Sequence, residues 1–232
     1  MSKRLAIIPA REGSKRIRYK NIKKLLGKPL IQYSLDACIK SKLFDKIHIS
    51  TDSKKILDVV KKSNLNISFF RSKKLSGDKT PISKVVINVL EEFKKRGKIF
   101  DEAWLIYATN PMVNEKILKA CSKKFNLMKR KGDHRILMAV NEYNHPIGKA
   151  QKLLKNGSLK PIFKKNFKTD SQKLKISYCD AGMVSVYPMK FFLKNKKMEF
   201  KPFILPKNQS IDINNLNDFK FAQKTLKNFK KK

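Results

Sequence analysis

Residues 3–21 read KRLAIIPAREGSKRIRYKN, and this stretch decides the fold that we expect. Leu5–Ile8 is a continuous apolar run, which is typical of a parallel strand covered on both faces, and Pro9 ends it. A basic loop around Gly13 follows, and its five cationic side chains are Arg11, Lys15, Arg16, Arg18 and Lys20. The stretch therefore predicts the first strand of an α/β sheet, with a ligand-binding loop at its carboxyl end.

The chemistry of this loop suits a polyphosphate. Gly13 lets the backbone come close to a bound group, and arginine and lysine match phosphate oxygens. The loop has neither the GxxxxGKS/T nor the GxGxxG pattern, so ordinary ATPase and dinucleotide-binding functions lose support. The residues alone also allow a solvated turn in a chain that is basic throughout. A nucleoside-triphosphate site and a plain basic turn both stay open at this point.

Positive charge is spread along the chain rather than gathered in one segment. The 232 residues include 55 Lys and Arg against 18 Asp and Glu, for a formal net charge of +37. Only eight of these cations are arginine and none lies beyond Arg135, whereas lysine occurs throughout. Proteins that read nucleic acids favour arginine and concentrate charge on one face. We therefore expect weak non-specific polyanion binding and no specific nucleic-acid partner.

Cysteine usage and hydropathy indicate a cytoplasmic protein. Cys38, Cys121 and Cys179 lie far apart without a metal-binding spacing, and the first two fall in helical apolar patterns that predict buried thiols. No signal-peptide pattern opens the chain, and no apolar run reaches ~18 residues. We expect no membrane insertion.

Apolar runs and helical patterns alternate, which predicts a doubly wound, mostly parallel α/β sheet in a single domain over residues 1–232. Strands are expected at 46–50, 67–70, 103–107, 136–140, 183–187 and 203–205, and helices at 30–40, 52–62, 81–95, 114–129 and 216–229. The alternation breaks at 142–179. We interpret that segment as a small inserted lobe with short strands around Leu159, Ile162 and Phe163.

Residues 8–22 read IPAREGSKRIRYKNI, which resembles the IPARGGSKRIPRKNI signature of the cytidylyltransferases that activate nine-carbon acidic sugars, the CMP-nonulosonic acid synthetases. Two departures are visible: Glu12 replaces a glycine, and Tyr19 follows Arg18 where the signature has Pro-Arg. The resemblance implies a Rossmann-like nucleotide-diphospho-sugar transferase fold and CTP as the nucleotide. The CTP contacts that it implies in this loop are Ala10, Arg11, Gly13, Ser14, Lys15, Lys20 and Asn21.

A second segment, residues 70–80 with the sequence FRSKKLSGDKT, resembles the RPxxLxxD segment that wraps cytosine and ribose in these enzymes. Leu75 matches the leucine of the motif, and the resemblance implies that Arg71, Asp78 and Thr80 bind the nucleotide. From the residues alone, the segment is a polar loop before a helix, with Asp78 or Thr80 capping that helix.

Two further segments resemble the pseudaminate branch of the family. Residues 105–111 read LIYATNP, where sialate and legionaminate enzymes usually have LQPTSP, and residues 178–182 read YCDAG, similar to the YxDAG of the branch. From the residues alone, these are a strand end with an Asn-Pro turn and a turn carboxylate that pairs with one of many lysines. The sugar-binding residues that the resemblance implies are Tyr107, Thr109, Gln172, Tyr178 and Asp180.

One sugar contact of the branch is missing. The branch has RSQDL where residues 170–174 read DSQKL, so Asp170 stands at the arginine that would clamp the sugar carboxylate. Lys168 and Lys173 are the candidates to replace it as point charges. The sugar therefore stays open between a pseudaminate-like acid and legionaminate, sialate or a ketodeoxyoctonate-like acid.

Residues 210–214 read SIDIN and resemble the IDID segment whose carboxylates hold Mg²⁺ in relatives. Asp212 keeps the first carboxylate, while Asn214 replaces the second and offers an amide oxygen. Mg²⁺ commonly takes only one or two carboxylates together with phosphate oxygens, so the resemblance implies Mg²⁺ at Asp212 and Asn214. Asp218 is an alternative, although the helical pattern places it in the first turn of the closing helix.

The resemblance implies that CMP passes from CTP to the anomeric C2 hydroxyl of a pseudaminate-like nonulosonic acid, with release of pyrophosphate. The catalytic residues that it implies are Arg11, Lys20 and Asp212, because this transfer depends on positioning and charge neutralisation. Relatives are homodimers whose inserted lobe closes the partner's sugar pocket, so residues 142–179 imply a homodimer. The altered metal motif keeps a second function open, a catalytically weak relative that binds nucleotides or polyanions.

Overall fold

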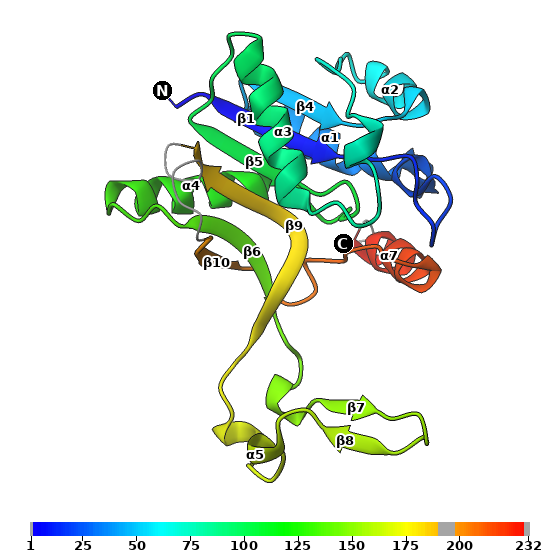
Figure 1. Cartoon of the computed structure of the whole chain (residues 1–232), viewed down its shortest axis with the longest axis vertical. Helices are drawn as coiled ribbons and strands as arrows, with labels where there is room; N and C mark the ends of the chain where they lie inside the picture. The colour runs from blue at the N-terminus through cyan, green and yellow to red at the C-terminus, as the bar shows by residue number, and fades with distance from the viewer. Residues whose placement is uncertain (1, 190–197, 230–232) are drawn as a thin grey trace.

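The computed structural model describes residues 2–189 and 198–229, and its centre is a six-stranded sheet (Figure 1). The strands are β1 (Arg4–Pro9), β4 (Lys46–Ser50), β5 (Glu102–Ile106), β6 (Ile136–Glu142), β9 (Tyr178–Pro188) and β10 (Phe200–Ile204). Their order is β10-β6-β9-β5-β1-β4. Neighbours run parallel except at β9, which is antiparallel to both β5 and β6. The predicted mostly parallel α/β sheet is confirmed.

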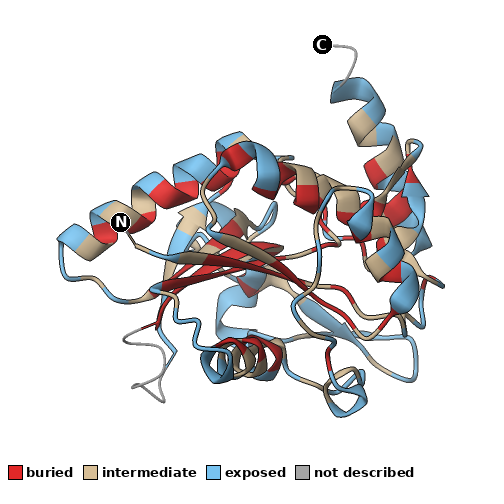
Figure 2. Ribbon diagram, turned by 90° about the horizontal axis from the view of Figure 1, so that it is seen from above, coloured by how far each residue is buried: buried red, intermediate tan, exposed pale blue. Residues whose placement is uncertain are grey.

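Helices cover both faces of this sheet, and the buried residues lie along the strands and on the inner faces of the helices (Figure 2). Alternate residues of β1 point to opposite faces: Ala6 and Ile8 join an apolar core with α1 and α4, while Leu5 and Ile7 join a second core with α3. The helices are α1 (Leu30–Ser41), α2 (Lys54–Lys61), α3 (Ile82–Lys95), α4 (Glu115–Arg130) and α7 (Leu216–Phe229). Each predicted helix is confirmed, with ends that differ by at most two residues.

The strand predicted at 67–70 is wrong, because these residues lie in the loop between α2 and α3. Phe69 accounts for the apolar run. Its ring packs 4.3 Å from the His48 ring and 5.2 Å from the Phe93 ring, so it fills a core instead of pairing in the sheet. At the end of this loop the Arg71 N–H donates to the Thr51 carbonyl, just after β4, at 2.7 Å.

The segment 178–182 lies inside β9 rather than before a strand, which corrects the expected start of that strand at 183. β9 pairs Tyr178 with Glu142 at one end and Val186 with Leu137 toward the other, and the register shifts between them. Gly182 has φ +55° at this irregularity. The YCDAG residues therefore belong to β9, at a point where its pairing with β6 is irregular.

Residues 143–177, between β6 and β9, form the inserted segment, and Figure 1 shows it extending away from the sheet. Its elements are β7 (Gln151–Leu153), β8 (Leu159–Pro161) and α5 (Lys164–Phe167). β7 and β8 form an antiparallel hairpin, as expected around Leu159, whereas Ile162 and Phe163 lie outside any strand. A second small hairpin, β2 (Lys24–Leu25) with β3 (Lys28–Pro29), follows the basic loop.

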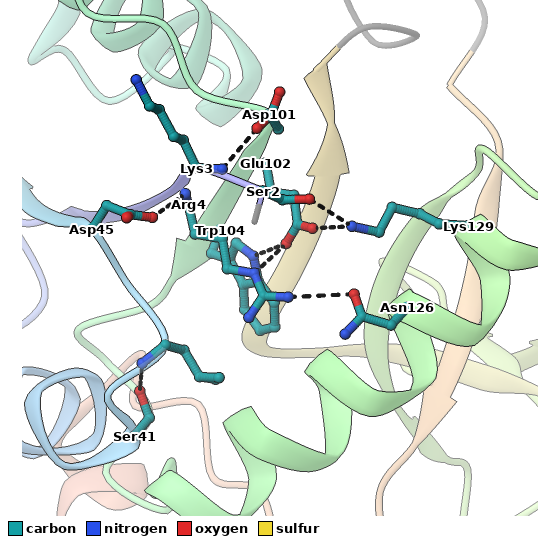
Figure 3. Close-up of polar contacts among 11 residues, drawn as sticks. Ser2, Lys3, Arg4, Ser41, Asp45, Asp101, Glu102, Trp104, Asn126 and Lys129 are labelled. Carbon is teal, nitrogen blue, oxygen red and sulfur yellow. Dashed lines mark hydrogen bonds and ion pairs between the residues drawn. The ribbon is translucent and has the colours of Figure 1, made fainter.

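A buried carboxylate fixes the amino ends of β1 and β5 (Figure 3). The Glu102 side chain is 1% exposed and accepts from Arg4 Nε at 3.0 Å and from Trp104 Nε1 at 3.0 Å. Lys129, from α4, pairs with its other oxygen. Arg4, Lys129 and the Trp104 indole therefore provide partners for the buried Glu102 carboxylate. This cluster lies at the amino ends of the strands, opposite the basic loop.

Cys38 and Cys121 are buried, as their helical apolar patterns predicted. Cys179, for which no burial was predicted, is half-buried. Burial raises the pKa of the Cys121 thiol to about 12, so this side chain behaves as a core residue. No helix in the described part of the chain is long and apolar enough to cross a membrane.

Candidate active site

A cleft of about 500 Å³ opens at the carboxyl ends of β1 and β5. Three segments line it: the basic loop after β1, the loop between α2 and α3, and the residues after β5. These segments are distant in sequence and meet because parallel strands deliver their carboxyl ends to one edge of the sheet. The predicted site residues among its lining are Arg11, Ser14, Lys15, Lys20, Asn21, Arg71, Asp78, Thr80, Tyr107 and Thr109.

Two buried residues of the basic loop, Ala10 and Asn21, form hydrogen bonds that hold its backbone. Ala10 is buried, and its N–H donates to the Ser50 carbonyl at 2.9 Å. Asn21 is also buried, and its amide donates to the Arg11 carbonyl at 3.0 Å, while its Oδ1 has no partner among the described residues. Open space surrounds Gly13, so the backbone there is accessible to a ligand.

Asp78 bridges the two sides of the cleft mouth. One of its oxygens pairs with Arg11 Nη2, and the other lies 2.8 Å from Lys15 Nζ. Arg11 Nη1 also donates to the Ser76 carbonyl at 3.3 Å. Lys15 and Arg11 hold the pKa of the Asp78 carboxyl below its ordinary value. Within the described residues no side chain caps α3, so the capping role considered for Asp78 or Thr80 is wrong.

Arg71 reaches the cleft while most of its donors serve the end of β4. Its Nε donates to Ser50 Oγ at 3.0 Å, and its Nη2 donates to the Ser50 carbonyl. The side chain is buried, and burial lowers its pKa to about 10. Arg71 therefore has a structural role, because it fixes the start of the loop that carries Asp78, and its nucleotide-binding role stays a prediction.

Asp212, the predicted catalytic acid, lies beside the end of β5. Thr109 Oγ1 donates to its Oδ1 at 2.7 Å, and Asn214 Nδ2 donates to its Oδ2 at 2.7 Å. The Ile213 N–H donates to the Thr109 carbonyl at 3.0 Å and anchors the segment. A Cβ at Gly182 would lie 2.9 Å from the Asp212 Cγ, so β9 approaches this carboxylate as closely as a glycine allows.

The basic loop is tied directly to the acidic segment. Lys20 Nζ donates to the Ile213 carbonyl at 2.7 Å, and Arg16 Nη2 donates to Asn214 Oδ1 at 3.3 Å. Burial lowers the pKa of the Lys20 ammonium, and the Asp212 charge opposes that shift. Cations of the basic loop therefore adjoin the segment that carries Asp212, an arrangement compatible with a metal-bound polyphosphate.

No group of three or more His, Cys, Asp or Glu side chains in the described part of the chain is arranged to hold a metal. Asp218 does not supplement Asp212, because its Oδ2 accepts from the backbone N–H groups of Asn214 and Asn215, at 2.8 and 2.9 Å. Asn215 Oδ1 in turn accepts from the Asp218 N–H at 3.0 Å. This reciprocal cap confirms that Asp218 belongs to the first turn of α7.

Tyr107 lines the cleft, and the charges of Asp180 and Asp212, which are not among the described lining residues, act on it. Burial, the nearby Asp180 carboxyl and Asp212 raise the pKa of Tyr107, so its phenol stays protonated. Burial also raises the pKa of Asp180, although the Gly182 N–H donates to its Oδ1 at 2.9 Å. A neutral phenol near an exposed carboxyl suits the hydroxyl and amide groups of a sugar.

A cytidylyltransferase family model matches residues 5–199 of this chain. The chain belongs to the cytidylyltransferase family. It is 37% identical over 225 residues to the pseudaminic acid cytidylyltransferase of Campylobacter jejuni, and the match covers 95% of each chain. A CMP-N,N'-diacetyllegionaminic acid synthase of Legionella pneumophila is 39% identical over 107 residues, 46% of each chain.

A solved structure of a CMP:2-keto-3-deoxy-manno-octonic acid synthetase complexed with CTP has a TM-score of 0.70 and 12% sequence identity with this cytidylyltransferase. The match covers 98% of this chain and 99% of the other. At that identity the likeness shows the fold alone. The predicted resemblance and the nucleotidyltransferase fold are thus confirmed by independent comparisons.

Two predicted sugar-binding residues of this cytidylyltransferase lie away from the cleft. Gln172 is exposed in the short 3-10 turn Ser171–Lys173 of the inserted segment, and Tyr178 stands opposite Glu142 at the start of β9. Neither is among the described residues that line the cleft. Lys173, a candidate for the sugar carboxylate, lies 3.1 Å from Asp170, so that pair is already formed within the segment.

Sequence reasoning missed a buried amide just after β5 in this cytidylyltransferase. Asn110 Nδ2 donates to the Ala181 carbonyl at 3.0 Å and to Ser210 Oγ at 2.9 Å. It therefore joins the end of β5, β9 and the segment before Asp212. The Asn-Pro dipeptide indicated only a turn, and nothing in it indicated partners this distant in sequence.

Proposed function

We propose that this cytidylyltransferase transfers CMP from CTP to the anomeric C2 hydroxyl of pseudaminic acid, or a close relative of it, and releases pyrophosphate. The observation that carries the proposal is the similarity to the Campylobacter jejuni pseudaminic acid cytidylyltransferase along nearly the whole chain. The cleft supports it with a cationic side suited to phosphates and, at Tyr107, a side suited to a sugar. The sugar hydroxyl bonds to the α-phosphorus, the bond from that phosphorus to the β-phosphate oxygen breaks, and the hydroxyl proton passes to solvent.

In this proposal the triphosphate lies against the basic loop. Arg11, Lys15 and Lys20 neutralise its charge, and the open backbone at Gly13 with Ser14 accommodates its oxygens. Such fixed cations act on charge that develops on the leaving pyrophosphate, and little covalent chemistry is required of the protein. The loop that starts at Arg71 then covers the nucleoside.

Mg²⁺ belongs to the proposal through Asp212. One carboxylate with phosphate oxygens and water is a sufficient ligand set for this ion. Asn214 now turns its amide oxygen to Arg16, so it would contact the ion only after that amide rotates. Asp212 would hold the ion, which would supply positive charge to neutralise the phosphates.

We also infer that two copies of the chain complete one sugar pocket. Gln172 and Tyr178 are not among the described residues that line the cleft, and Figure 1 shows the segment between β6 and β9 extending away from the sheet. That segment also exposes large apolar side chains, with Leu153, Ile176 and Leu159 67%, 65% and 60% accessible. Exposed apolar groups on an extended hairpin are a typical interface between identical subunits.

The proposed substrate is tested by pyrophosphate release from CTP with pseudaminic, legionaminic, sialic or 3-deoxy-manno-octulosonic acid. We expect the highest kcat/KM with pseudaminic acid. A higher kcat/KM with another acid would identify that acid as the substrate and would leave the proposed reaction unchanged. CTP binding without turnover on any of the four, at millimolar Mg²⁺, would favour the catalytically weak relative.

The two-copy site is tested with Leu159→Asp in β8, which places a charge on the hairpin. We expect a monomer by sedimentation, with CTP binding retained and sugar turnover lost. Ile99→Asp, at another exposed apolar residue that is 71% accessible, is the control. A dimeric Leu159→Asp variant, or a fully active monomer, would contradict this inference.

A further inference from the structure

The cations that face the phosphates in the proposed function already hold an anion that belongs to the protein. Asp78 gives one carboxylate oxygen to Arg11 and the other to Lys15, and the two cations lie on the opposite side of the cleft mouth. A carboxylate bound in this way occupies the same donors as two phosphate oxygens would. In the chain without ligand, the cationic loop is therefore at least partly neutralised from within.

Several contacts make this arrangement more than a chance surface pair. Arg11 uses a second nitrogen on the Ser76 carbonyl, so its guanidinium is fixed to the loop that carries Asp78. The start of the same loop is immobilised through Arg71 and Ser50. The pairs with Arg11 and Lys15 are thus what hold the rest of this loop, around residues 76–78, across the cleft.

The pair is also weak enough to be replaced. The side chains of Arg11, Asp78 and Lys15 are 31%, 37% and 85% exposed, and exposed ion pairs contribute little free energy. A polyphosphate carries several charges where Asp78 carries one. Its oxygens can therefore take both cations and release the carboxylate.

We propose that Asp78 is an internal counter-anion that occupies the phosphate cations of the free enzyme, is displaced when a polyphosphate binds, and returns when pyrophosphate leaves. This deepens the proposed function, on which it rests for the identity of the polyphosphate. In this proposal Asp78 acts by pairing with Arg11 and Lys15, and not by contacting the cytosine or the ribose. It also couples the loop over the nucleoside to occupancy of the phosphate site.

The test uses tripolyphosphate, which has neither base nor ribose, titrated calorimetrically into Asp78→Asn without divalent cations at fixed ionic strength. We expect its Kd to fall about three- to tenfold relative to the unaltered chain, the range that release of two exposed pairs allows. The control is Glu92→Gln on α3, which also removes one carboxylate paired with a lysine and an arginine, Lys95 and Arg96. This control should leave the Kd unchanged.

Three results would overturn the proposal. The first two are a tripolyphosphate Kd of Asp78→Asn that equals or exceeds that of the unaltered chain. The third is that neither the unaltered chain nor Asp78→Asn nor Glu92→Gln binds tripolyphosphate. Weaker CTP binding with an unchanged tripolyphosphate Kd would assign Asp78 to the nucleoside instead. Circular dichroism establishes that the variants are folded. Turnover of CTP with the sugar acids tests the proposed function separately, so either idea can fail while the other stands.

Discussion

The Asp212 carboxylate lies against the bare Cα of Gly182: a Cβ built on that glycine would be 2.9 Å from the Asp212 Cγ and 3.1 Å from its Oδ2. Gly182 also has φ +55°, and its N–H holds Asp180 at 2.9 Å. One residue of β9 therefore sets the position of two carboxyl groups in the candidate site.

Gly182→Ala should displace Asp212, because a methyl group and the carboxylate cannot occupy the same space. We expect turnover to fall by about 10- to 100-fold, the scale expected when a reacting group moves by an ångström. Gly132→Ala is the matched control, since it has φ +68° with nothing within 4 Å of its Cβ. Equal losses of activity in both variants would show that backbone strain, rather than displacement of Asp212, is responsible.

Lys20→Ala should lower kcat by about 100- to 1000-fold, by analogy with the loss of one fixed donor to a developing charge. Lys20 also holds the Ile213 carbonyl next to Asp212, so the acid should lose support at the same time. Steady-state kinetics at saturating CTP measure the effect, with Lys40→Ala at the exposed end of α1 as the control. Near-normal kcat in Lys20→Ala would remove this residue from the catalytic group.

His48 should make the protein less stable in acid. It is buried between Phe69 and Phe93, neither ring nitrogen has a partner in the described residues, and burial lowers its pKa to about 3. Its unfolded pKa is about 6.5. Above 6.5 its imidazole is neutral in both states. Below it, only the unfolded chain gains the proton, so stability falls until the folded pKa is reached.

The slope of this loss is at most about 1.4 kcal/mol per pH unit between about pH 6 and 3. Urea unfolding across that range measures it. His48→Phe keeps an aromatic ring in the core and cannot be protonated, so its unfolding free energy should depend on pH less steeply by that amount. Parallel pH profiles for the two proteins would show that His48 does not titrate as proposed.

Glu102→Gln should destabilise the fold by about 3–5 kcal/mol, because it removes one member of a buried charge cluster and leaves Arg4 and Lys129 uncompensated. The cluster lies at the amino ends of the strands, so the KM for CTP should not change. Urea unfolding checks the first expectation and kinetics the second. Glu92→Gln, an exposed counterpart, should change stability little.

Elements with strong local patterns could be predicted from the sequence. The strand at 46–50 and the helix at 216–229 have the expected bounds, because a short strand-like run and an amphipathic repeat are local signals. The apolar run at 67–70 also predicted a strand, and that prediction is wrong, because the Phe69 ring packs on Phe93 and the segment does not join the sheet. Hydropathy alone does not separate these two outcomes.

The cleft could be predicted only in part. The segments 11–21, 71–80 and 107–109 follow strands or resemble motifs, and the fold brings them together. The pairing of Asp78 with Arg11 and Lys15 and the approach of Gly182 to Asp212 join residues distant in the chain, so no local pattern records them. The sugar-binding roles of Gln172 and Tyr178 remain predictions, and in the proposed function they require a second copy of the chain.

The cap that fixes the start of α7 has a consequence for biosynthesis. Asp212 follows every strand of the described sheet in the chain, and the Asn215–Asp218 cap that steadies its segment follows later still. The cationic loop and all the described sheet strands therefore precede Asp212 in the order of synthesis. In the proposed function, a product terminated after β10 would keep the cations that face the triphosphate and lack Asp212, so we expect it to be inactive.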